Sequence, residues 1–214
     1  MQQKKHILIT AGPTREYIDP VRFISNRSSG KLGYQIAEEF SKKYKITLIS
    51  GPVNLKPPKN VDICYIETSD EMFKLVKKFL NKVDAIISCA AVCDFKPLKL
   101  YKNKLKKTKK YRLIKLINTK DILEYCGLNK KNDQILIGFA LETDRKNSIK
   151  YAINKLLKKN LDLIVLNYPD SFGSDWITPT LIFRNGVIKK YKKLKKKAFV
   201  KILLNWLEKL ISKK

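Results

Sequence analysis

The sequence is poor in the residues that most often hold metal ions or cross-link chains. Its 214 residues include one histidine, His6, and four cysteines. Cys89 and Cys93 are close enough in sequence to bind one metal ion, but no second pair follows them. So few cysteines in a chain of this size do not indicate a secreted disulfide scaffold. We therefore expect buried free thiols in a reduced, cytoplasmic protein, and we assign no side chain as a direct metal ligand.

Long apolar runs are also missing. The apolar stretch near the N-terminus is too short for a signal peptide, and no stretch approaches the roughly 20 residues of a membrane span. A basic amphipathic helix at the C-terminus could lie on a membrane surface. The alternative is a helix that covers the core, with Phe199, Ile202, Leu203, Trp206, Leu207 and Leu210 on its apolar side.

Acidic residues are few. The chain has 19 of them and 46 basic residues, which gives a formal net charge of +27. Such a charge is typical of nucleic-acid-binding proteins. However, only six of the basic residues are arginine, which base readout favours, and the lysines are spread along the whole chain. We therefore expect no specific nucleic-acid partner and no membrane partner, but a cationic surface that attracts anionic substrates.

Apolar runs that alternate with helical patterns indicate the fold. Short buried strands are predicted at His6–Thr10, Lys45–Ser50, Asp62–Ile66 and Val83–Ser88. Helices are predicted from Ser28 or Ser29 to about Lys43 and over Ser69–Leu80. This alternation predicts one α/β domain over residues 1–214, with a Rossmann-like, mostly parallel sheet flanked by helices.

The segment Lys96–Tyr111 interrupts this pattern, because it is mostly lysine and has no sustained period. We expect a mobile lysine-rich flap there. Beyond it, strands are predicted at Arg112–Ile117, Gln134–Leu141 and Leu161–Asn167, with helices from Thr119 and over Asp144–Lys159. A hairpin with a type I′ turn at Asn185-Gly186 is predicted between strands Leu181–Phe183 and Val187–Lys190.

The stretch Arg22–Gly33, RFISNRSSGKLG, is similar to a phosphate-binding loop, because a Gly-Lys pair follows two serines ahead of a predicted helix. It is not a Walker loop, because Ser25 stands where the first glycine belongs and Leu32 follows the lysine. The dinucleotide fingerprint GxGxxG is also missing after the first strand, which weakens a nicotinamide-dependent reductase as an alternative. A helix start at Ser28–Lys31 remains, either as an anion site or as an ordinary capped helix.

Three other stretches could join that site. The loops after Thr10 and after Ser88 leave the same edge of a parallel sheet, so they should be neighbours in space. In the second loop, Asp94 could accept hydrogen bonds from a ligand or could simply cap a turn. Lys155 and Lys159 share one helix face, where they could bind phosphate or face solvent. The lysine-rich flap could fold over a polyphosphate or remain a solvated charge run.

The ordered motifs of the chain resemble one family. ITAGPTREYIDPVRFISNRSSGKLGYQIA, SGPV, CAAVCDF, KLKK, IGFALET and KNLDLIVLN follow one another over Ile9–Asn167. This series resembles phosphopantothenate–cysteine ligase, also called phosphopantothenoylcysteine synthetase, the second half of the bifunctional coenzyme A biosynthesis protein. The resemblance implies that 4′-phosphopantothenate reacts with CTP, assisted by Mg²⁺, to an acyl-cytidylate, and that L-cysteine then displaces CMP.

The same resemblance implies roles for individual residues. Asn26 would contact the acyl-cytidylate and support attack by cysteine, Arg22 would be its partner, and Lys104 of the flap would stabilise charge. Phe139 would pack on the base or ribose, and Lys155 and Lys159 would bind the triphosphate. The remaining residues expected at the substrates or nucleotide are Gly12, Ser28, Ser29, Gly30, Lys31, Ala90, Ala91, Asp94, Lys120, Asp121, Ile122 and Leu123.

Some features depart from the family pattern. Cys93 replaces an alanine, the spacing between Phe139 and Lys155 is longer, and the segment after Phe172 lacks an asparagine, so we give that segment less weight. The flavin-dependent decarboxylase half does not precede the domain, and the Met1 start favours a stand-alone ligase, with a separate decarboxylase as a partner. The family implies a homodimer. Bacterial-type motifs favour CTP, with ATP as the alternative.

Overall fold

The computed structural model describes residues 4–107 and 110–213. One mixed sheet of eight strands runs through the molecule in the order β13-β12-β10-β9-β6-β1-β4-β5. Neighbouring strands from β5 to β10 pair in parallel, whereas β12 and β13 add an antiparallel edge. The strands are β1 (His6–Ala11), β4 (Lys45–Ser50), β5 (Asp62–Tyr65), β6 (Ala85–Ser88), β9 (Ile135–Leu141), β10 (Leu163–Asn167), β12 (Thr180–Phe183) and β13 (Ile188–Lys190). The predicted fold class is confirmed.

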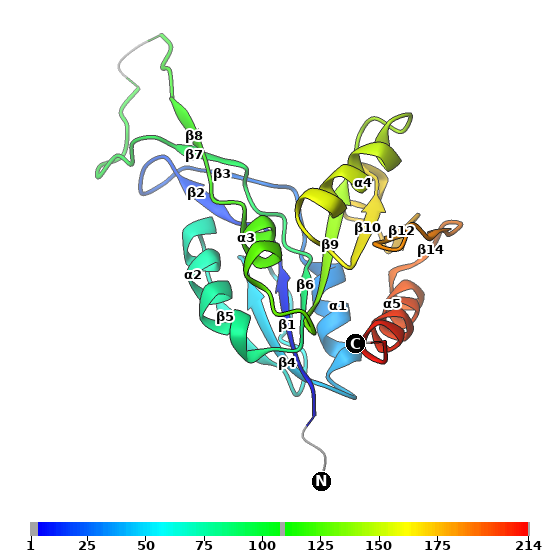
Figure 1. Ribbon diagram of the computed structural model, residues 1–214. Coiled ribbons are helices and arrows are strands. Elements are labelled where there is room, and N and C mark those ends of the chain that lie inside the picture. The colour runs from blue at the N-terminus through cyan, green and yellow to red at the C-terminus, as the bar shows by residue number, and fades with distance from the viewer. Residues whose placement is uncertain (1–3, 108–109, 214) are drawn as a thin grey trace.

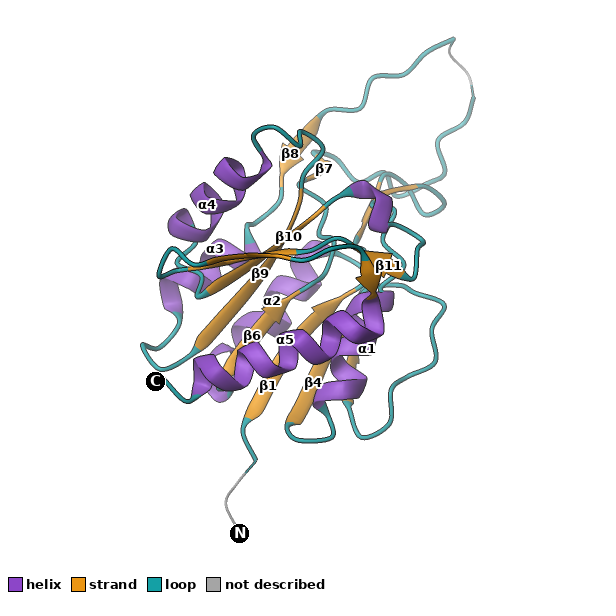
Figure 2. Cartoon of the chain, turned by 90° about the vertical axis from the view of Figure 1, so that its right-hand side faces the viewer, coloured by secondary structure: helices purple, strands orange, loops and turns teal. Residues whose placement is uncertain are grey.

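Helices cover both faces of this sheet (Figures 1 and 2). On one face, α1 (Lys31–Phe40) and α5 (Lys196–Ile211) share a core cluster with Ile7 and Ile9 of β1. On the other face, α2 (Ser69–Phe79), α3 (Ile122–Asn129) and α4 (Ser148–Lys158) pack with Leu8. Alternate residues of one strand thus enter opposite cores, which is why the strands read as continuous apolar runs.

Three small two-stranded sheets lie outside the main sheet: β2 (Arg15–Tyr17) with β3 (Phe23–Ser25), β7 (Phe95–Pro97) with β8 (Leu116–Asn118), and β11 (Trp176–Ile177) with β14 (Leu194–Lys195). Short 3₁₀ helices span Leu80–Lys82 and Pro169–Ser171. The first two sheets and their loops form an arm, residues 15–25, 95–107 and 110–118, that extends from the body of the molecule (Figure 1).

The predicted flap belongs to this arm. Its described residues beyond β7 have no helix or strand, whereas residues 108 and 109 lie outside the described part. Its mobility stays a prediction. The strand predicted at Arg112–Ile117 was wrong in its bounds, because only Leu116–Asn118 is a strand, and it pairs with β7 outside the main sheet.

Two other local predictions were also wrong in detail. The helix expected from Asp144 begins at Ser148, because Oδ1 of Asp144 accepts the amide hydrogens of Lys146 and Asn147 in a turn before the helix. The hairpin at residues 180–190 exists, but the turn is not type I′. Gly186 has a positive φ of 84° and Asn185 does not, and the Gly186 amide bonds the Phe183 carbonyl, as in a three-residue loop.

Candidate active site

A cavity of about 840 Å³ opens at the carboxyl ends of the central strands. The chain leaves β1 towards β4 and β5 and returns to β6 on the other side of β1. The connections that follow β1 and β6 therefore lead to helices on opposite faces of the sheet, and a ligand can bind at this switch point beyond the strand ends. The volume is in the range typical of small-molecule sites, about 300–1,000 Å³.

The loop after β6 forms one wall, and backbone hydrogen bonds hold it to the loop after β1. The Ala91 amide donates to the Gly12 carbonyl at 2.9 Å, and the Thr14 amide donates to the Ala91 carbonyl at 3.3 Å. Asn26 closes this wall, because its Nδ2 donates to the carbonyls of Ala91 and Val92, both at 3.0 Å. The expected meeting of the two loops is confirmed.

The start of α1 forms the floor. Neither Ser28 nor Ser29 caps this helix, contrary to the sequence prediction, because Gly30 occupies the N-cap position with a φ of 72° and no side-chain bond. A side chain at Gly30 would come within 2.7 Å of Val53 Cγ1 and 3.3 Å of Gly12 Cα. Glycine thus lets two loops and the helix start approach closely, and the first turn of α1 keeps unpaired amide groups at the cavity.

Three lysines at the cavity are paired with carboxylates. Lys155 Nζ lies 2.7 Å from Glu142 Oε1, and Lys159 Nζ lies 2.7 Å from Asp121 Oδ2. Lys31 pairs with the exposed Asp175 in the same way. These contacts hold the ammonium groups at the cavity rim, where a phosphate could take the place of the carboxylates.

Asp121 links this group of charges to α3. Its Oδ1 accepts the Glu124 amide at 2.9 Å and so caps the helix. Burial alone would raise the pKa of Asp121, but the Lys159 ammonium and the Glu124 amide outweigh it and lower that pKa. The carboxylate is therefore ionised, and it fixes Lys159 beside the start of the helix.

Most residues predicted for the site line this one cavity. They are Asn26, Ser28, Ser29, Gly30, Lys31, Ala90, Ala91, Asp94, Lys120, Asp121, Ile122, Leu123, Phe139, Lys155 and Lys159. Three predicted residues do not line it. The Gly12 carbonyl accepts the hydrogen bond that holds Ala91 of the wall. Arg22 and Lys104 lie in the arm.

Sequence reasoning missed Lys196. This first residue of α5 lines the cavity, is only 6% exposed, and donates from Nζ to the Ser171 carbonyl at 2.8 Å. Burial lowers its pKa, and the neighbouring Lys31 charge acts in the same direction. One lysine among 46 basic residues gave no signal in the sequence. Phe172 and Gly173, in the segment to which we gave less weight, also line the cavity.

Carboxylates that could hold a metal ion are sparse. Within residues 4–107 and 110–213, no three histidine, cysteine, aspartate or glutamate side chains gather as a metal-binding group. Asp94, Asp121 and Glu124 nevertheless line the cavity. One or two carboxylates fit the mode in which Mg²⁺ binds together with substrate phosphates. Across the described part of the chain, no helix is long and apolar enough to cross a membrane.

Comparisons with known proteins show the family of the chain. Residues 2–211 match the family described as DNA/pantothenate metabolism flavoprotein C-terminal domain. The coenzyme A biosynthesis bifunctional protein CoaBC of Borreliella burgdorferi is 43% identical over 204 residues, which are 94% of this chain and 52% of that protein. Its counterpart in Haemophilus influenzae is 40% identical over 215 positions, 99% of this chain and 52% of that protein. The chain thus spans about half the length of the curated relatives it matches.

Solved structures extend these similarities. The crystal structure of the C-terminal domain of CoaBC has a TM-score of 0.85 and 38% identity, and the match covers 99% of this chain and 98% of that one. A Cab2 variant in complex with phosphopantothenate-cysteine has a TM-score of 0.78 at 16% identity, over 97% of this chain and 88% of that one. The second similarity shows a shared fold.

Proposed function

Because the chain belongs to the family of the DNA/pantothenate metabolism flavoprotein C-terminal domain, we propose that it is a phosphopantothenate–cysteine ligase of coenzyme A biosynthesis. The observation that carries this proposal is the convergence of fifteen predicted residues, from five separate stretches of sequence, on one cavity. Relatives that share 40–43% of their residues with this chain are named for coenzyme A biosynthesis. A structural neighbour holds phosphopantothenate-cysteine.

The proposed reaction has two steps. The carboxylate of 4′-phosphopantothenate attacks the α-phosphorus of CTP, the bond from that phosphorus to the bridging oxygen breaks, and pyrophosphate leaves. The amino group of L-cysteine then attacks the acyl carbon, the bond from that carbon to the CMP oxygen breaks, and the amine proton passes to solvent. Both transition states gather negative charge on oxygen, which fixed donors and cations stabilise.

The cavity offers suitable groups for each part of the nucleotide. Lys31, Lys155, Lys159 and Lys196 are the cations that we assign to the phosphates. The unpaired amide groups at the start of α1 would add donors to the same anions. Mg²⁺ would neutralise charge on the phosphates, and Asp94 and Glu124 are the carboxylates available to hold it.

The remaining side chains suit the other two partners of the reaction. Phe139, half-buried at the end of β9, offers an apolar face for a base or ribose. Asn26 is fixed by its two bonds to the loop after β6, so its side chain is preorganised beside the acyl group of the intermediate. Ala90 and Ala91 let the ligand approach that loop closely.

The test is an assay with 4′-phosphopantothenate, L-cysteine and Mg²⁺ that compares CTP with ATP and detects the product and the released monophosphate by mass spectrometry. The proposal expects product and CMP with CTP. Product with ATP alone would keep the ligase and refute the choice of nucleotide, and no product with either nucleotide would refute the ligase. Asn26→Ala should accumulate acyl-cytidylate, whereas Asn132→Ala, at an exposed site outside the cavity, should behave as the unaltered protein.

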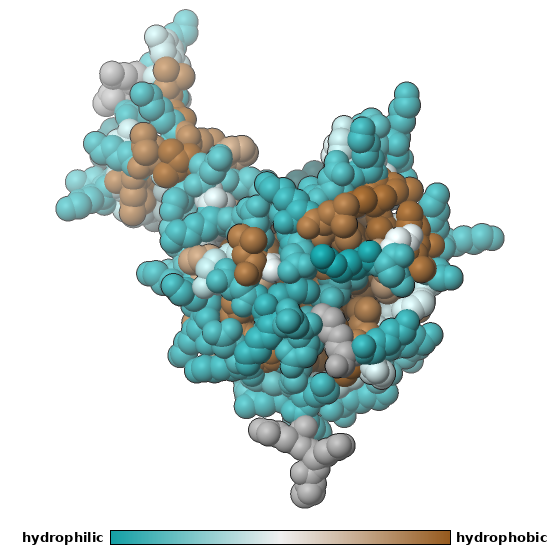
Figure 3. Space-filling view, viewed as in Figure 1, coloured by the Kyte–Doolittle hydropathy of each residue, from teal (hydrophilic) through white to brown (hydrophobic). Residues whose placement is uncertain are grey.

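We also propose that the protein forms a homodimer through the arm. Large apolar side chains are exposed there, and they gather on the surface of the arm (Figure 3): Val21, Phe23, Phe95, Leu98, Leu100, Leu113 and Leu116. A monomer rarely exposes so many neighbouring apolar groups without a partner. Light scattering should report a dimer, and Leu113→Asp should shift it to the monomer, whereas Leu128→Asp on α3 should not.

A further inference from the structure

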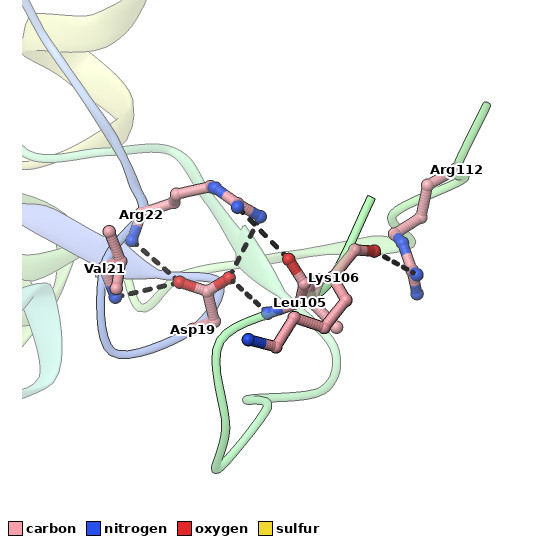
Figure 4. A network of polar contacts seen from close by, with 6 residues as sticks. All are labelled: Asp19, Val21, Arg22, Leu105, Lys106 and Arg112. Atoms are coloured by element: carbon pink, nitrogen blue, oxygen red, sulfur yellow. Dashed lines mark hydrogen bonds and ion pairs between the residues drawn. The ribbon is translucent and has the colours of Figure 1, made fainter. Parts of the chain in front are cut away.

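A buried carboxylate organises the tip of the loop between β2 and β3 (Figure 4). Asp19 is 0% exposed, although it lies in a loop. Its Oδ1 accepts the amide hydrogens of Val21 at 2.8 Å and Arg22 at 2.9 Å. These two bonds are local and would suffice to shape the loop. The second oxygen, Oδ2, is directed elsewhere.

Oδ2 of Asp19 reaches across to the lysine-rich flap. It accepts a hydrogen bond from the Leu105 amide at 3.1 Å and another from Arg22 Nη1 at 3.2 Å. Arg22 Nη2 in turn donates to the Leu105 carbonyl at 3.2 Å. Asp19 and Arg22 therefore bind both polar groups of a single residue that is more than eighty positions away in sequence.

We propose that Asp19 and Arg22 are positioning residues. Their hydrogen bonds to the backbone of Leu105, which we call the clasp, fix the backbone position of the adjacent Lys104. This inference rests on the proposed function, in which Lys104 stabilises charge at the phosphates. It gives Arg22 a role through the flap. It also assigns a role to Asp19, which the sequence analysis did not single out.

The length of the free chain explains why such a clasp matters. The connection from β7 to β8 runs from residue 98 to residue 115, and a flexible loop of this length would let Lys104 sample a large volume. The clasp divides the connection. A second anchor lies close by, because the Tyr101 amide donates to the Ile18 carbonyl at 3.0 Å. Lys104 thus belongs to a short stretch that is held on both sides.

The clasp is also connected to the cavity. Arg22 directly precedes β3, and Asn26 directly follows it. The four steps from Arg22 to Asn26 span roughly 13 Å in an extended strand. One short strand therefore sets the positions of both the cavity residue Asn26 and the clasp. Lys104 itself does not line the cavity, and its charge at the phosphates belongs to the proposed function.

The chemistry of the clasp requires these two side chains. Two carboxylate oxygens face four donors, and an asparagine would turn its own amino group towards some of them. Arginine bridges the carboxylate and the Leu105 carbonyl with two nitrogens of one planar group, and lysine has only one nitrogen to offer. Asp19→Asn and Arg22→Lys should therefore open the clasp without a change in side-chain size large enough to disturb the fold.

The first measurement is hydrogen exchange at the Leu105 amide in the free protein. The unaltered chain should protect it, and both Asp19→Asn and Arg22→Lys should lose that protection by about tenfold or more. Asp133→Asn, at an exposed turn outside the cavity and the arm, is the matched control. Thermal unfolding shows whether each variant is folded. Unchanged protection in both folded variants would overturn the clasp, whatever the enzyme does.

The second measurement is a double-mutant cycle in the ligase assay. Asp19→Asn and Lys104→Met should each lower kcat/KM, by about 10- to 100-fold for a misplaced catalytic group. If Asp19 acts through Lys104, the double variant should be no slower than Lys104→Met alone. Fully additive losses would overturn the positioning role. A lack of activity in the unaltered protein would instead refute the ligase, and with it any role of Lys104, while the exchange result still decides the clasp.

Discussion

Gly127→Ala should destabilise the protein, although the same change stabilises most helices. In an exposed helix interior, alanine is favoured over glycine by about 1 kcal/mol. Gly127 of α3, however, is buried against the end of α4. A Cβ there would lie 1.9 Å from the Lys159 carbonyl oxygen and 2.7 Å from its carbonyl carbon. Both are backbone atoms, so no side-chain rotation can relieve the overlap.

The neighbouring backbone also resists a shift. Asn160 has a positive φ of 51°, and its Nδ2 donates to the Gly127 carbonyl at 2.8 Å. Overpacking of a core typically costs about 1–3 kcal/mol, and this site lies at the upper end because backbone must move. After the propensity gain, we expect a net loss of about 1–2 kcal/mol. In a protein of this size, each kcal/mol lowers Tm by about 2–4 °C.

The same change should reach the cavity. If α3 moves away from Lys159, then Asp121 at its N-cap separates from that lysine, and the wall formed by Ile122 and Leu123 moves too. Calorimetry should therefore show a lower Tm and weaker binding of CTP. Leu128→Ala, at the next and 76% exposed position of the helix, is the control and should change neither by much. A Tm for Gly127→Ala above that of the unaltered protein would refute the reasoning.

Three further predictions follow from buried and partly buried groups. Lys196→Met should weaken CTP binding about tenfold or more without lowering Tm, since a hydrogen bond to a charged group is worth about 1.5–3 kcal/mol; an unchanged Kd by calorimetry would contradict it. Burial, with the charge of Lys45, lowers the pKa of His6, so unfolded chains bind more protons and the free energy of unfolding should fall as pH drops from 6.5 through that pKa. NMR titration of this single ring should therefore give a midpoint below 6.5, and a midpoint above it would refute the argument. Burial raises the pKa of Cys89 and Cys126 to about 12, so iodoacetamide at pH 8 should spare both thiols until denaturant is added, and fast labelling of the native protein would contradict this.

The sequence predicted the central sheet well because its strands are buried on both faces. Lys45–Ser50 was predicted to the residue, since apolar runs bounded by glycine or charge leave little choice of boundary. The prediction was poorer where side-chain bonds decide the backbone. Asp144 delays the start of α4, and Gly30 takes the N-cap position from two serines that would otherwise be preferred.

The cavity and three of its lysines, Lys31, Lys155 and Lys159, were predictable, but Lys196 and the support of the flap by Asp19 were not. The loops after β1 and β6 were expected to meet, because parallel strands send their ends to one edge. Lys196 was missed because its approach to the cavity depends on how α5 packs. Asp19 was missed for a similar reason, since its long-range partner, the Leu105 backbone, carries no signal in the sequence.

The paired lysines of the cavity also change what the large positive charge means for affinity. Under the proposed function, a nucleotide that arrives at Lys31, Lys155 and Lys159 would meet Asp175, Glu142 and Asp121 already in contact with them. Binding would then be an exchange of anions, in which phosphate oxygens replace the carboxylates. The free energy gained at each lysine would be the difference between its interaction with phosphate and its interaction with the carboxylate. We therefore expect that a ligand with a single weak anionic group would not displace these carboxylates. Salt should therefore weaken nucleotide binding less steeply than a net charge of +27 would indicate.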